Sequence, residues 1–449
     1  MIQILYLKGA EWKLTDIDKF REIYRYPEKV LDYHSTHPSG KIGSALSKPC
    51  QNKEDLSLAY TPGVAIPSLI IKDNPEAAYQ YTARGNLVAV ISNGTAVLGL
   101  GNIGSLAGKP VMEGKSMLFK KFAGIDSFDV EVATEDPEEF IKCVKLISGT
   151  FGGINLEDIK SPECFEIEER LIHELEIPVF HDDQHGTAIV VAAALENALL
   201  ITGRKIENLK TVFCGAGAAA IAIARLLVKM GLNKNSTLMC DINGVVYKGR
   251  QNDMNPWKEP FAAETSCRTL RDAVAGADLF IGVSASGLLN SEMIKTMNAD
   301  PIIFALANPI PEVSFETIQS LNSKILFASG RSDYPNQVNN LLGFPYIFRG
   351  ALDSRARRIN DEMKLAAARA IAETAREPIS DEVFKITGNR KLEFGREYLI
   401  PSSFDSRLFE RVPFAVAKAA IQSGVSKFGQ EFLETYQEKL INRDIGNFR

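Results

Sequence analysis

The sequence predicts an α/β fold, with a Rossmann-type doubly wound parallel sheet, an N-terminal α/β substrate domain, and helical N- and C-terminal segments. Between residues 209 and 328, short apolar runs alternate with helical segments, which is typical of a parallel sheet covered on both faces. A glycine-rich turn, Gly215-Ala-Gly217-Ala-Ala-Ala220, separates the first of these runs from a helical segment. An earlier apolar run, Leu87-Val-Ala-Val-Ile-Ser92, indicates another sheet.

The secondary structure expected along the chain follows from hydrophobic periodicity and from glycine and proline breaks. The expected strands are 87–92, 95–99, 177–180, 209–214, 236–240, 277–283, 301–305 and 324–328. The expected helices are most of 1–60, then 138–147, 187–201, 218–230, 269–275, 291–297, 315–321 and much of 360–449. We expect three parts: a substrate and catalytic domain (1–180), a dinucleotide-binding domain (181–425) and a helical tail (426–449).

Composition excludes several classes of function. The chain has 449 residues, a net charge of −5 and a pI near 5.8, without the clusters of Lys and Arg that a nucleic-acid surface needs. No two of its six cysteines have CxxC spacing, which favours free thiols over a zinc site. The first residues lack a basic region and a cleavage site, and the longest apolar stretch contains Arg225. We therefore expect a cytoplasmic protein without membrane or nucleic-acid partners.

Two segments match a loose GxGxxG pattern, and their surroundings separate them. The match at 215–220 follows a predicted strand, opens a predicted helix, and precedes a strand that ends at Asp241, where a carboxylate can bind a ribose hydroxyl. The match at 99–104 is followed by Gly108, Pro110 and Gly114, so we expect no helix to begin there. The segment 99–104 is interpreted as a substrate-domain loop whose glycines allow close backbone packing.

Acidic residues follow two of the short strands in the first half of the chain. Glu157 and Asp158 come after the glycine pair 152–153, and Asp182 and Asp183 lie in Phe180-His-Asp-Asp-Gln-His-Gly186. Oxygen ligands at strand ends suit a hard cation such as Mg²⁺ or Mn²⁺. His181 and His185 could be ligands, but beside these carboxylates we favour hydrogen-bonding roles for them. Tyr60 and Lys115 lie near turns, and their setting alone establishes no chemistry.

Several longer motifs occur together in the order typical of one family. They are Leu58-Ala-Tyr-Thr-Pro-Gly-Val-Ala65, Leu98-Gly-Leu-Gly-Asn-Ile-Gly104, Pro110-Val-Met-Glu-Gly-Lys115, Phe151-Gly-Gly-Ile-Asn-Leu-Glu-Asp158, Val179-Phe-His-Asp-Asp-Gln-His-Gly-Thr187, Phe304-Ala-Leu-Ala-Asn-Pro309 and Asn336-Gln-Val-Asn-Asn340. With these motifs the sequence resembles the malic enzymes, in particular their compact bacterial form, over most of residues 35–360. The resemblance implies oxidative decarboxylation of malate to pyruvate and CO₂, with NAD or NADP as cofactor and Mg²⁺ or Mn²⁺ as metal.

The resemblance also implies roles for individual residues. Lys115 is expected to be the general base, with Asp182 beside it and a pKa lowered by the nearby cation, and Tyr60 the general acid. Glu157, Asp158 and Asp183 are the expected metal ligands, and Asn308, Asn339 and Asn340 the expected substrate contacts. The expected cofactor-binding residues are Gly215, Gly217, Ala218, Ala220, Asp241, Ser284 and Asn308. A homodimer is implied, in which Tyr60 can enter the site from the partner subunit.

Some features depart from the family pattern, and some choices stay open. Larger members have an arginine that grips a substrate carboxylate where this sequence has Ala96, and many bacterial relatives have a phosphotransacetylase-like extension that is not expected here. Asp241 favours NAD because it would repel a 2′-phosphate, although Lys248 and Arg250 follow it. Alternative functions are a malolactic enzyme, which yields lactate, another Rossmann dehydrogenase, or a catalytically inactive binding protein.

Overall fold

The structure is a computed structural model that describes residues 27–97, 99–321, 324–388 and 390–443. The chain divides into two compact units, residues 1–44 and residues 45–449. In the first unit the described helix is α2 (Pro27–Ser35). The helices predicted within residues 1–26 lie outside the described part. All elements below belong to the second unit.

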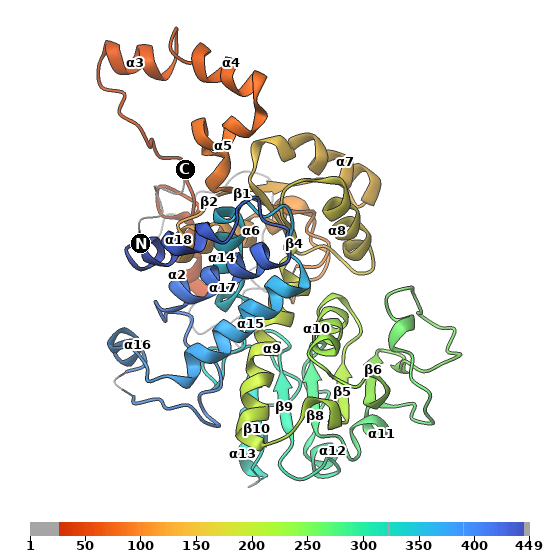
Figure 1. Cartoon of the computed structure of the whole chain (residues 1–449). Helices are drawn as coiled ribbons and strands as arrows, with labels where there is room; N and C mark the ends of the chain where they lie inside the picture. The colour runs from red at the N-terminus through yellow and green to blue at the C-terminus, as the bar shows by residue number, and fades with distance from the viewer. Residues whose placement is uncertain (1–26, 98, 322–323, 389, 444–449) are drawn as a thin grey trace. The chain divides into compact units, whose positions relative to one another are not determined.

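The first sheet has four parallel strands in the order β2-β1-β3-β4 (Figure 1). The strands are β1 (Leu87–Ser92), β2 (Asp126–Glu131), β3 (Gly153–Leu156) and β4 (Val179–His181). The helices between them are α6 (Ser105–Ala123), α7 (Pro137–Ile147) and α8 (Glu163–Glu174). Every residue of β1, β3 and β4 is buried, which explains why these strands have continuous rather than alternating apolar character.

The second sheet has six strands in the order β10-β9-β8-β5-β6-β7. They are β5 (Thr211–Cys214), β6 (Thr237–Asp241), β7 (Gly244–Val245), β8 (Leu279–Gly282), β9 (Ile302–Ala305) and β10 (Leu326–Ser329). All pairs are parallel except β6 with β7. The strand order reverses between β5 and β8, and in such sheets ligands bind in the crevice outside the carboxyl ends of these strands.

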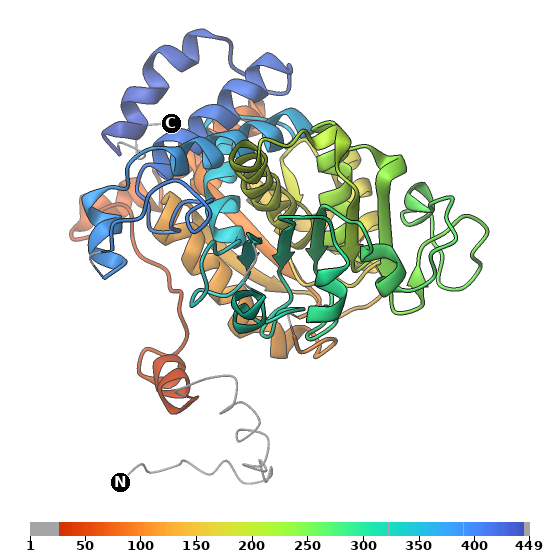
Figure 2. The ribbon, with the colours of Figure 1, turned by 90° about the horizontal axis from the view of Figure 1, so that it is seen from below.

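Helices cover both faces of the second sheet (Figure 2). One face packs on α9 (Asp182–Thr202) and α10 (Ala218–Lys229), and the other on α11 (Leu270–Val274), α12 (Ser291–Lys295) and α13 (Phe315–Ser320). Successive residues of β5 alternate between the two cores, since Phe213 belongs to one and Val212 and Cys214 to the other. The predicted doubly wound α/β fold is confirmed.

The C-terminal part returns to helix, as the sequence predicts. The helices are α14 (Phe344–Asp353), α15 (Asp361–Arg376), α16 (Asp381–Ile386), α17 (Leu408–Gln422) and α18 (Glu431–Ile441). All ten residues of α14 are buried, and the Phe348 ring packs edge-on against Phe119 and Phe180 of the first half of the chain. Helix α9 has the length and hydropathy of a membrane span, but 61% of that window is buried. It is a core helix here.

Two sequence predictions were wrong between β1 and α6. The segment 95–97 forms turns with a single bridge from Val97 to Gly101 instead of a strand, and α6 begins at Ser105, directly after Gly104. Pro110 lies inside α6, where its missing N–H leaves the Leu106 carbonyl without a helical donor. Leu106 is 80% exposed, so water can satisfy that carbonyl. A Cβ atom on Gly94 would lie 2.2 Å from the Gly104 carbonyl oxygen, so glycine at position 94 allows the close approach to the start of α6.

One segment of the second unit is not packed into the core. Helices α3 (Lys53–Ala59) and α4 (Ala65–Asp73), which flank the turn that carries Tyr60, contain no buried residue. We call residues 53–73 the exposed arm. Several of its apolar side chains are exposed, namely Leu56, Leu58, Val64, Ile66, Leu69 and Ile70. A segment with so many exposed apolar side chains is typical of a protein–protein contact.

Candidate functional site

Three carboxylates meet where the neighbouring strands β3 and β4 end. Glu157 and Asp158 follow β3, and Asp183 lies in the first turn of α9, directly after β4. One carboxylate oxygen of each lies within 4.8 Å of the others. Glu157 and Asp158 are buried, while Asp183 accepts a hydrogen bond from the Asp158 backbone N–H at 2.8 Å. The structure thus brings together the residues predicted as metal ligands.

The electrostatics of this cluster fit a bound cation. Burial raises the pKa of Glu157 well above its usual range, opposed by Lys115 and reinforced by Asp183, Asp182 and Asp158. A buried carboxylate surrounded by other acids is costly unless a positive charge compensates it. Carboxylate oxygens in this number are the donors that Mg²⁺ and Mn²⁺ prefer. The donor set and its crowding therefore suit a hard divalent cation.

Lys115, on α6, points its ammonium group at the same cluster. Its Nζ lies 2.5 Å from Asp182 Oδ2 and 2.9 Å from Glu157 Oε1, and 4.3 Å from the centre of the Phe344 ring. Burial alone would lower the pKa of Lys115, but the charges of Asp182 and Glu157 outweigh it and raise that pKa above its usual value. The sequence predicts a lowered pKa for Lys115 near a cation. Without a bound cation the pKa of Lys115 is raised instead, because two carboxylates contact its amine.

Asp182 is held by contacts from distant parts of the chain. It is fully buried, and Asn340 Nδ2 donates to its Oδ2 at 3.1 Å, while the Asn340 amide oxygen accepts from Thr187 at 3.0 Å. A Cβ atom on Gly186 would lie 1.9 Å from Asp182 Oδ1, so only glycine leaves room for this carboxylate. Asn340, predicted to contact substrate, is thus a direct neighbour of the Lys115–Asp182 pair.

A buried network behind β4 and α9 was not predicted. Glu168 on α8 accepts from the His181 backbone N–H at 2.8 Å and from the His185 ring at 2.9 Å, and its pKa falls to about 2 despite burial because of His185 and Lys364. His185 has the hydrogen-bonding role that the sequence favours. Glu168 therefore fixes the backbone from which Asp182 and Asp183 project. The sequence feature that could have revealed this role is the position of Glu168 on the buried face of the amphipathic helix α8.

The predicted cofactor-binding residues lie at the carboxyl ends of β5, β8 and β9. Gly215 and Gly217 follow β5, Ala218 and Ala220 begin α10, and Ser284 and Asn308 follow β8 and β9. Gly215 has φ +124°, and a Cβ there would lie 2.9 Å from the Val283 carbonyl oxygen. The N-terminus of α10 faces this crevice, as pyrophosphate binding requires. Residues far apart in the sequence are therefore gathered at one switch point.

Glu312 joins two loops of this crevice and was not predicted. It is fully buried, and its carboxylate accepts from the Ser284 N–H at 2.9 Å and the Ala307 N–H at 3.1 Å. A Cβ on Gly282 would lie 2.4 Å from its carboxyl carbon. Glu312 thus holds the loops after β8 and β9 in fixed positions. A lone Glu in a Pro-rich loop offers no sequence signal for this role.

Gly217→Val is expected to raise the KM for the cofactor by about ten-fold or more, because the side chain would occupy space that the pyrophosphate needs. Gly217 has an ordinary φ and no atom within 4 Å of an added Cβ, so the fold itself should tolerate valine. Gly149→Val is the matched control, since Gly149 also has open space around it. Steady-state kinetics with varied cofactor measure the effect. Equal KM values in both variants would contradict the assignment.

Asp241 ends β6 where a ribose contact is predicted, but the protein itself occupies its oxygens. Lys258 Nζ lies 3.0 Å from Oδ2, Arg250 also pairs with Oδ2, and the Asn243 N–H donates to Oδ1 at 2.9 Å. Burial would raise the pKa of Asp241, but these hydrogen bonds lower it. Lys248 pairs instead with a glutamate. Because two cations neutralise Asp241, it repels a 2′-phosphate less than a free carboxylate would.

Tyr60, predicted as the general acid, and Asn339, predicted as a substrate contact, do not contact the carboxylate cluster. Tyr60 is 69% exposed at the end of α3, on the exposed arm. Asn339 caps the short helix η7 (Asn340–Leu342), and its side chain accepts from the Leu341 N–H at 2.9 Å. Ala96, at the position of the usual substrate arginine, donates its backbone N–H to the Asp158 carbonyl at 2.9 Å.

Comparison with known proteins identifies the family. Residues 39–172 match the domain described as "Malic enzyme, N-terminal domain", and residues 184–384 match "Malic enzyme, NAD binding domain". A protein of Halomonas elongata named "NADP-dependent malic enzyme" is 54% identical over 400 residues, which are 89% of this chain and 94% of that protein. The chain belongs to the malic enzyme family. The resemblance found in the sequence is thereby confirmed.

Other relatives include a protein about twice as long as this chain and two solved structures that match it over nearly their whole length. The "NADP-dependent malic enzyme" of Rhizobium meliloti is 55% identical over 93% of this chain, and this chain spans about half its length (55%). The "malic enzyme from Pyrococcus horikoshii" has a solved structure with a TM-score of 0.83 at 42% identity, covering 94% of this chain and 96% of that one. The "Entamoeba histolytica Malic Enzyme" structure gives 0.85 at 32% identity, covering 98% and 90%.

Proposed function

We propose that this protein oxidises malate with NAD or NADP and releases CO₂ and pyruvate, in a reaction that depends on Mg²⁺ or Mn²⁺. One observation supports the proposal most: Lys115, whose side chain is only 11% exposed, lies between Asp182 and the Glu157 carboxylate of a three-acid cluster. The loop before α6 also meets the loop after β9 at the cofactor crevice, since a Cβ atom on Gly99 would lie 3.4 Å from the Pro309 ring. The proposed substrate site and the proposed cofactor site would therefore share neighbouring loops.

The roles of the residues follow from their chemistry. A divalent cation held by Glu157, Asp158 and Asp183 would act as a Lewis acid that polarises the substrate carbonyl. Lys115 is placed to take the proton of the malate hydroxyl as hydride leaves for the nicotinamide. Asp182, fixed by Asn340, orients the Lys115 amine. Asn308 and Asn339 would contact substrate or nicotinamide.

Lys115 must be neutral when it accepts this proton. Without a bound cation, Asp182 and Glu157 together stabilise its ammonium form. Once the charge of Glu157 is committed to a cation, one of these two stabilising contacts is lost, and a nearby positive charge also disfavours the ammonium. The pKa of Lys115 is therefore expected to fall when the metal site is filled. The same carboxylate thus serves metal binding and control of the base.

Metal removal tests the proposed function directly. Treatment with a chelator is expected to abolish malate-dependent reduction of NAD(P), and added Mn²⁺ is expected to restore it. The measurement is absorbance of the reduced nicotinamide with malate, before and after Mn²⁺ is returned. Full activity after exhaustive chelation would reject the proposal, because the acidic cluster would then have no catalytic use.

We also propose that the protein acts as a homodimer and that Tyr60 acts in the site of the partner subunit. Tyr60 is exposed on the arm of residues 53–73, whose helices α3 and α4 contain no buried residue. Docking of the arm on a second copy would bury its apolar side chains and bring the Tyr60 hydroxyl to the carbon that is protonated. The free thiols of the described cysteines agree with a reducing, cytoplasmic setting.

Subunit mixing is expected to restore activity if Tyr60 acts across the interface. Tyr60→Phe and Lys115→Ala dimers each lack one proton carrier at both sites. A mixed dimer would have one site with both carriers intact and one site with neither. Mixing the two inactive proteins under conditions that exchange subunits should therefore recover up to about a quarter of wild-type activity, given half heterodimers with one good site each.

The control for this mixing experiment combines Lys115→Ala subunits with Asp183→Asn subunits. If Tyr60 acts in trans, Lys115 and Asp183 belong to the same chain's site, so each site of a mixed dimer lacks one of the two. That mixture should stay inactive. Recovery in the control mixture but not in the Tyr60 mixture would contradict the proposal, as would a monomeric protein at assay concentration.

A further inference from the structure

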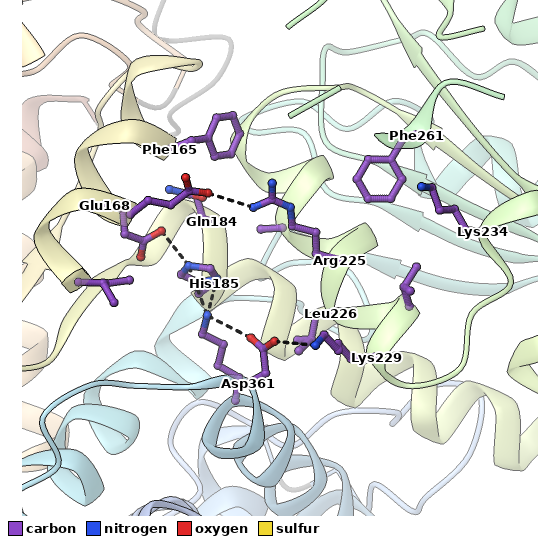
Figure 3. Close-up of a pocket in the computed structure, with 15 residues that line it drawn as sticks. Phe165, Glu168, Gln184, His185, Arg225, Leu226, Lys229, Lys234, Phe261 and Asp361 are labelled. Atoms are coloured by element: carbon purple, nitrogen blue, oxygen red, sulfur yellow. Dashed lines mark hydrogen bonds and ion pairs between the residues drawn. The ribbon is translucent and has the colours of Figure 1, made fainter. Parts of the chain in front are cut away.

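A second cavity lies apart from the carboxylate cluster and the cofactor crevice. It encloses about 400 Å³ and is lined by residues of α8, α9, α10, α15 and the short helix η6 (Glu259–Phe261) (Figure 3). This volume is within the range of small-molecule sites. Arg225 on its wall lies seven residues along α10 from Ala218, or about 10 Å from the helix N-terminus that faces the cofactor. The cavity is therefore separate from the cofactor crevice, and its wall shares Glu168 and His185 with the network behind the carboxylate cluster.

Three cations around this cavity have loose or no partners. Arg225 lies 3.7 Å from Glu169 and Lys229 lies 3.5 Å from Asp361, both beyond a direct charge-assisted hydrogen bond of roughly 2.7–2.9 Å. Within the described part of the chain, none of Arg225, Lys229 and Lys234 donates a side-chain hydrogen bond, and Lys234 forms no ion pair. Their donors are therefore available to a ligand.

Other lysines in this protein show the contrast. Lys109, Lys120 and Lys160 each contact a carboxylate oxygen at 2.6–2.7 Å. Among the acids at the cavity, Glu168 is less available to these cations because it already accepts from the His181 backbone N–H and the His185 ring. Figure 3 shows the Glu168 carboxylate turned to His185 rather than to Arg225.

The floor of the cavity has a fourth cation, the buried Lys364. It is 8% exposed, and its Nζ hydrogen-bonds the His185 ring at 3.2 Å and lies 3.7 Å from Asp361. An ammonium has three donors, and a buried one is costly unless they are used. Burial lowers the pKa of Lys364, and the nearby Glu168 and Asp361 carboxylates oppose this shift only in part. An anion in the cavity would compensate this charge.

Part of the remaining wall is apolar, and the rest is polar, formed by Glu168, Glu169, Gln184, His185 and Asp361. The Phe165 and Phe261 rings, Ile172 and Leu226 line the cavity, and Phe165 is backed by a stacked Trp257 at 5.1 Å between ring centroids. Lys234 Nζ lies 5.7 Å from the centre of the Phe261 ring. A ligand that fits must combine a compact anionic group with an apolar or aromatic body. A phosphate offers several oxygens to guanidinium and ammonium donors from different directions.

We propose that the cavity between α8, α9, α10 and α15 binds a small organic phosphate, with its phosphate among Arg225, Lys229 and Lys364 and its apolar body against Phe165 and Phe261. Nucleotides and sugar phosphates share this anionic group, and an aryl ester matches the wall best. The site is independent of the proposed catalytic residues, because none of its five named contacts is among them.

Isothermal titration calorimetry with phenyl phosphate tests this site on the whole protein, without malate or metal. Wild type is expected to bind with a Kd on the order of 1 mM or tighter. Phenol lacks the dianion and inorganic phosphate lacks the apolar body, so both should bind more weakly. Arg225→Ala and Lys229→Ala should each weaken phenyl phosphate by about ten-fold, since each removes a charge-assisted contact. Lys120→Ala, a surface lysine elsewhere, should not.

The same titration distinguishes this cavity from the cofactor crevice. Saturating NADP should leave phenyl phosphate binding in place, and malate turnover by Arg225→Ala should match wild type. Displacement by NADP would assign the heat to the cofactor site and overturn the proposal. Absence of binding at about 10 mM, or equal affinity of wild type and Arg225→Ala, would overturn it as well.

Discussion

Asp183→Asn is expected to fold normally and to lose nearly all metal-dependent turnover. The amide keeps an oxygen that can accept from the Asp158 N–H, so the local hydrogen bond survives while the charge is removed. Loss of a residue that only hydrogen-bonds a metal ligand typically lowers metal affinity by roughly 10–100-fold. Loss of one of three anionic ligands should lower the metal affinity by more than that. The Mn²⁺ concentration for half-maximal activity should therefore rise by more than about 100-fold.

Mn²⁺ titration of activity, together with a thermal melt, measures both parts of this result. Asp126→Asn is the control, because Asp126 is a half-exposed carboxylate that pairs with Lys120 at 2.7 Å on the surface. That variant should keep the wild-type Mn²⁺ dependence. Unchanged Mn²⁺ dependence in Asp183→Asn, with normal melting, would remove Asp183 from the metal site.

Variants of Lys115 and Tyr60 are expected to fail at different steps. Lys115→Ala should not oxidise malate, since it lacks the amine that takes the hydroxyl proton, and it should keep some ability to tautomerise enolpyruvate. Tyr60→Phe should still decarboxylate oxaloacetate but should protonate enolpyruvate slowly. General acid–base catalysis is worth about 10²–10⁴-fold, so losses of this size are expected.

Uptake of deuterium at C3 of pyruvate separates the two variants. Tyr60→Phe should exchange far more slowly than wild type, and Lys115→Ala should retain a measurable rate. Phenylalanine keeps the ring and removes only the hydroxyl, and Tyr60 is exposed, so folding is not at issue. Exchange by Tyr60→Phe at the wild-type rate would make Tyr60 a structural residue.

Much of the second sheet could be predicted because β5, β8, β9 and β10 are buried along their whole length and are bounded by polar turns. The apolar runs at 211–214, 279–282 and 302–305 are therefore continuous and easily recognised. Helix α6 could not be predicted, because its cost at Pro110 is offset by packing that only the fold provides: Gly108 fits against Gly94, and Met112 and Phe119 are fully buried. Local propensity gave the wrong result where tertiary contacts decide.

Among the site residues too, some could be predicted from local sequence and others depend on tertiary contacts. Glu157, Asp158 and Asp183 were predictable because acids after buried strands need a partner. Lys258 and Glu168 were not, because their roles depend on contacts with Asp241 and His181 that periodicity does not encode. The exposure of Tyr60 was also unpredictable from one chain, since it concerns the surface that a second copy would cover.

The most direct test of the central claim is the stoichiometry of products from malate with Mn²⁺ and either cofactor. We expect one reduced cofactor, one CO₂ and one pyruvate for each malate consumed. A relative from Bacillus subtilis, 49% identical, is named "Bifunctional malic/malolactic enzyme", so lactate is measured in the same reaction. Lactate with no net cofactor reduction, or no malate consumption with the metal present, would contradict the account.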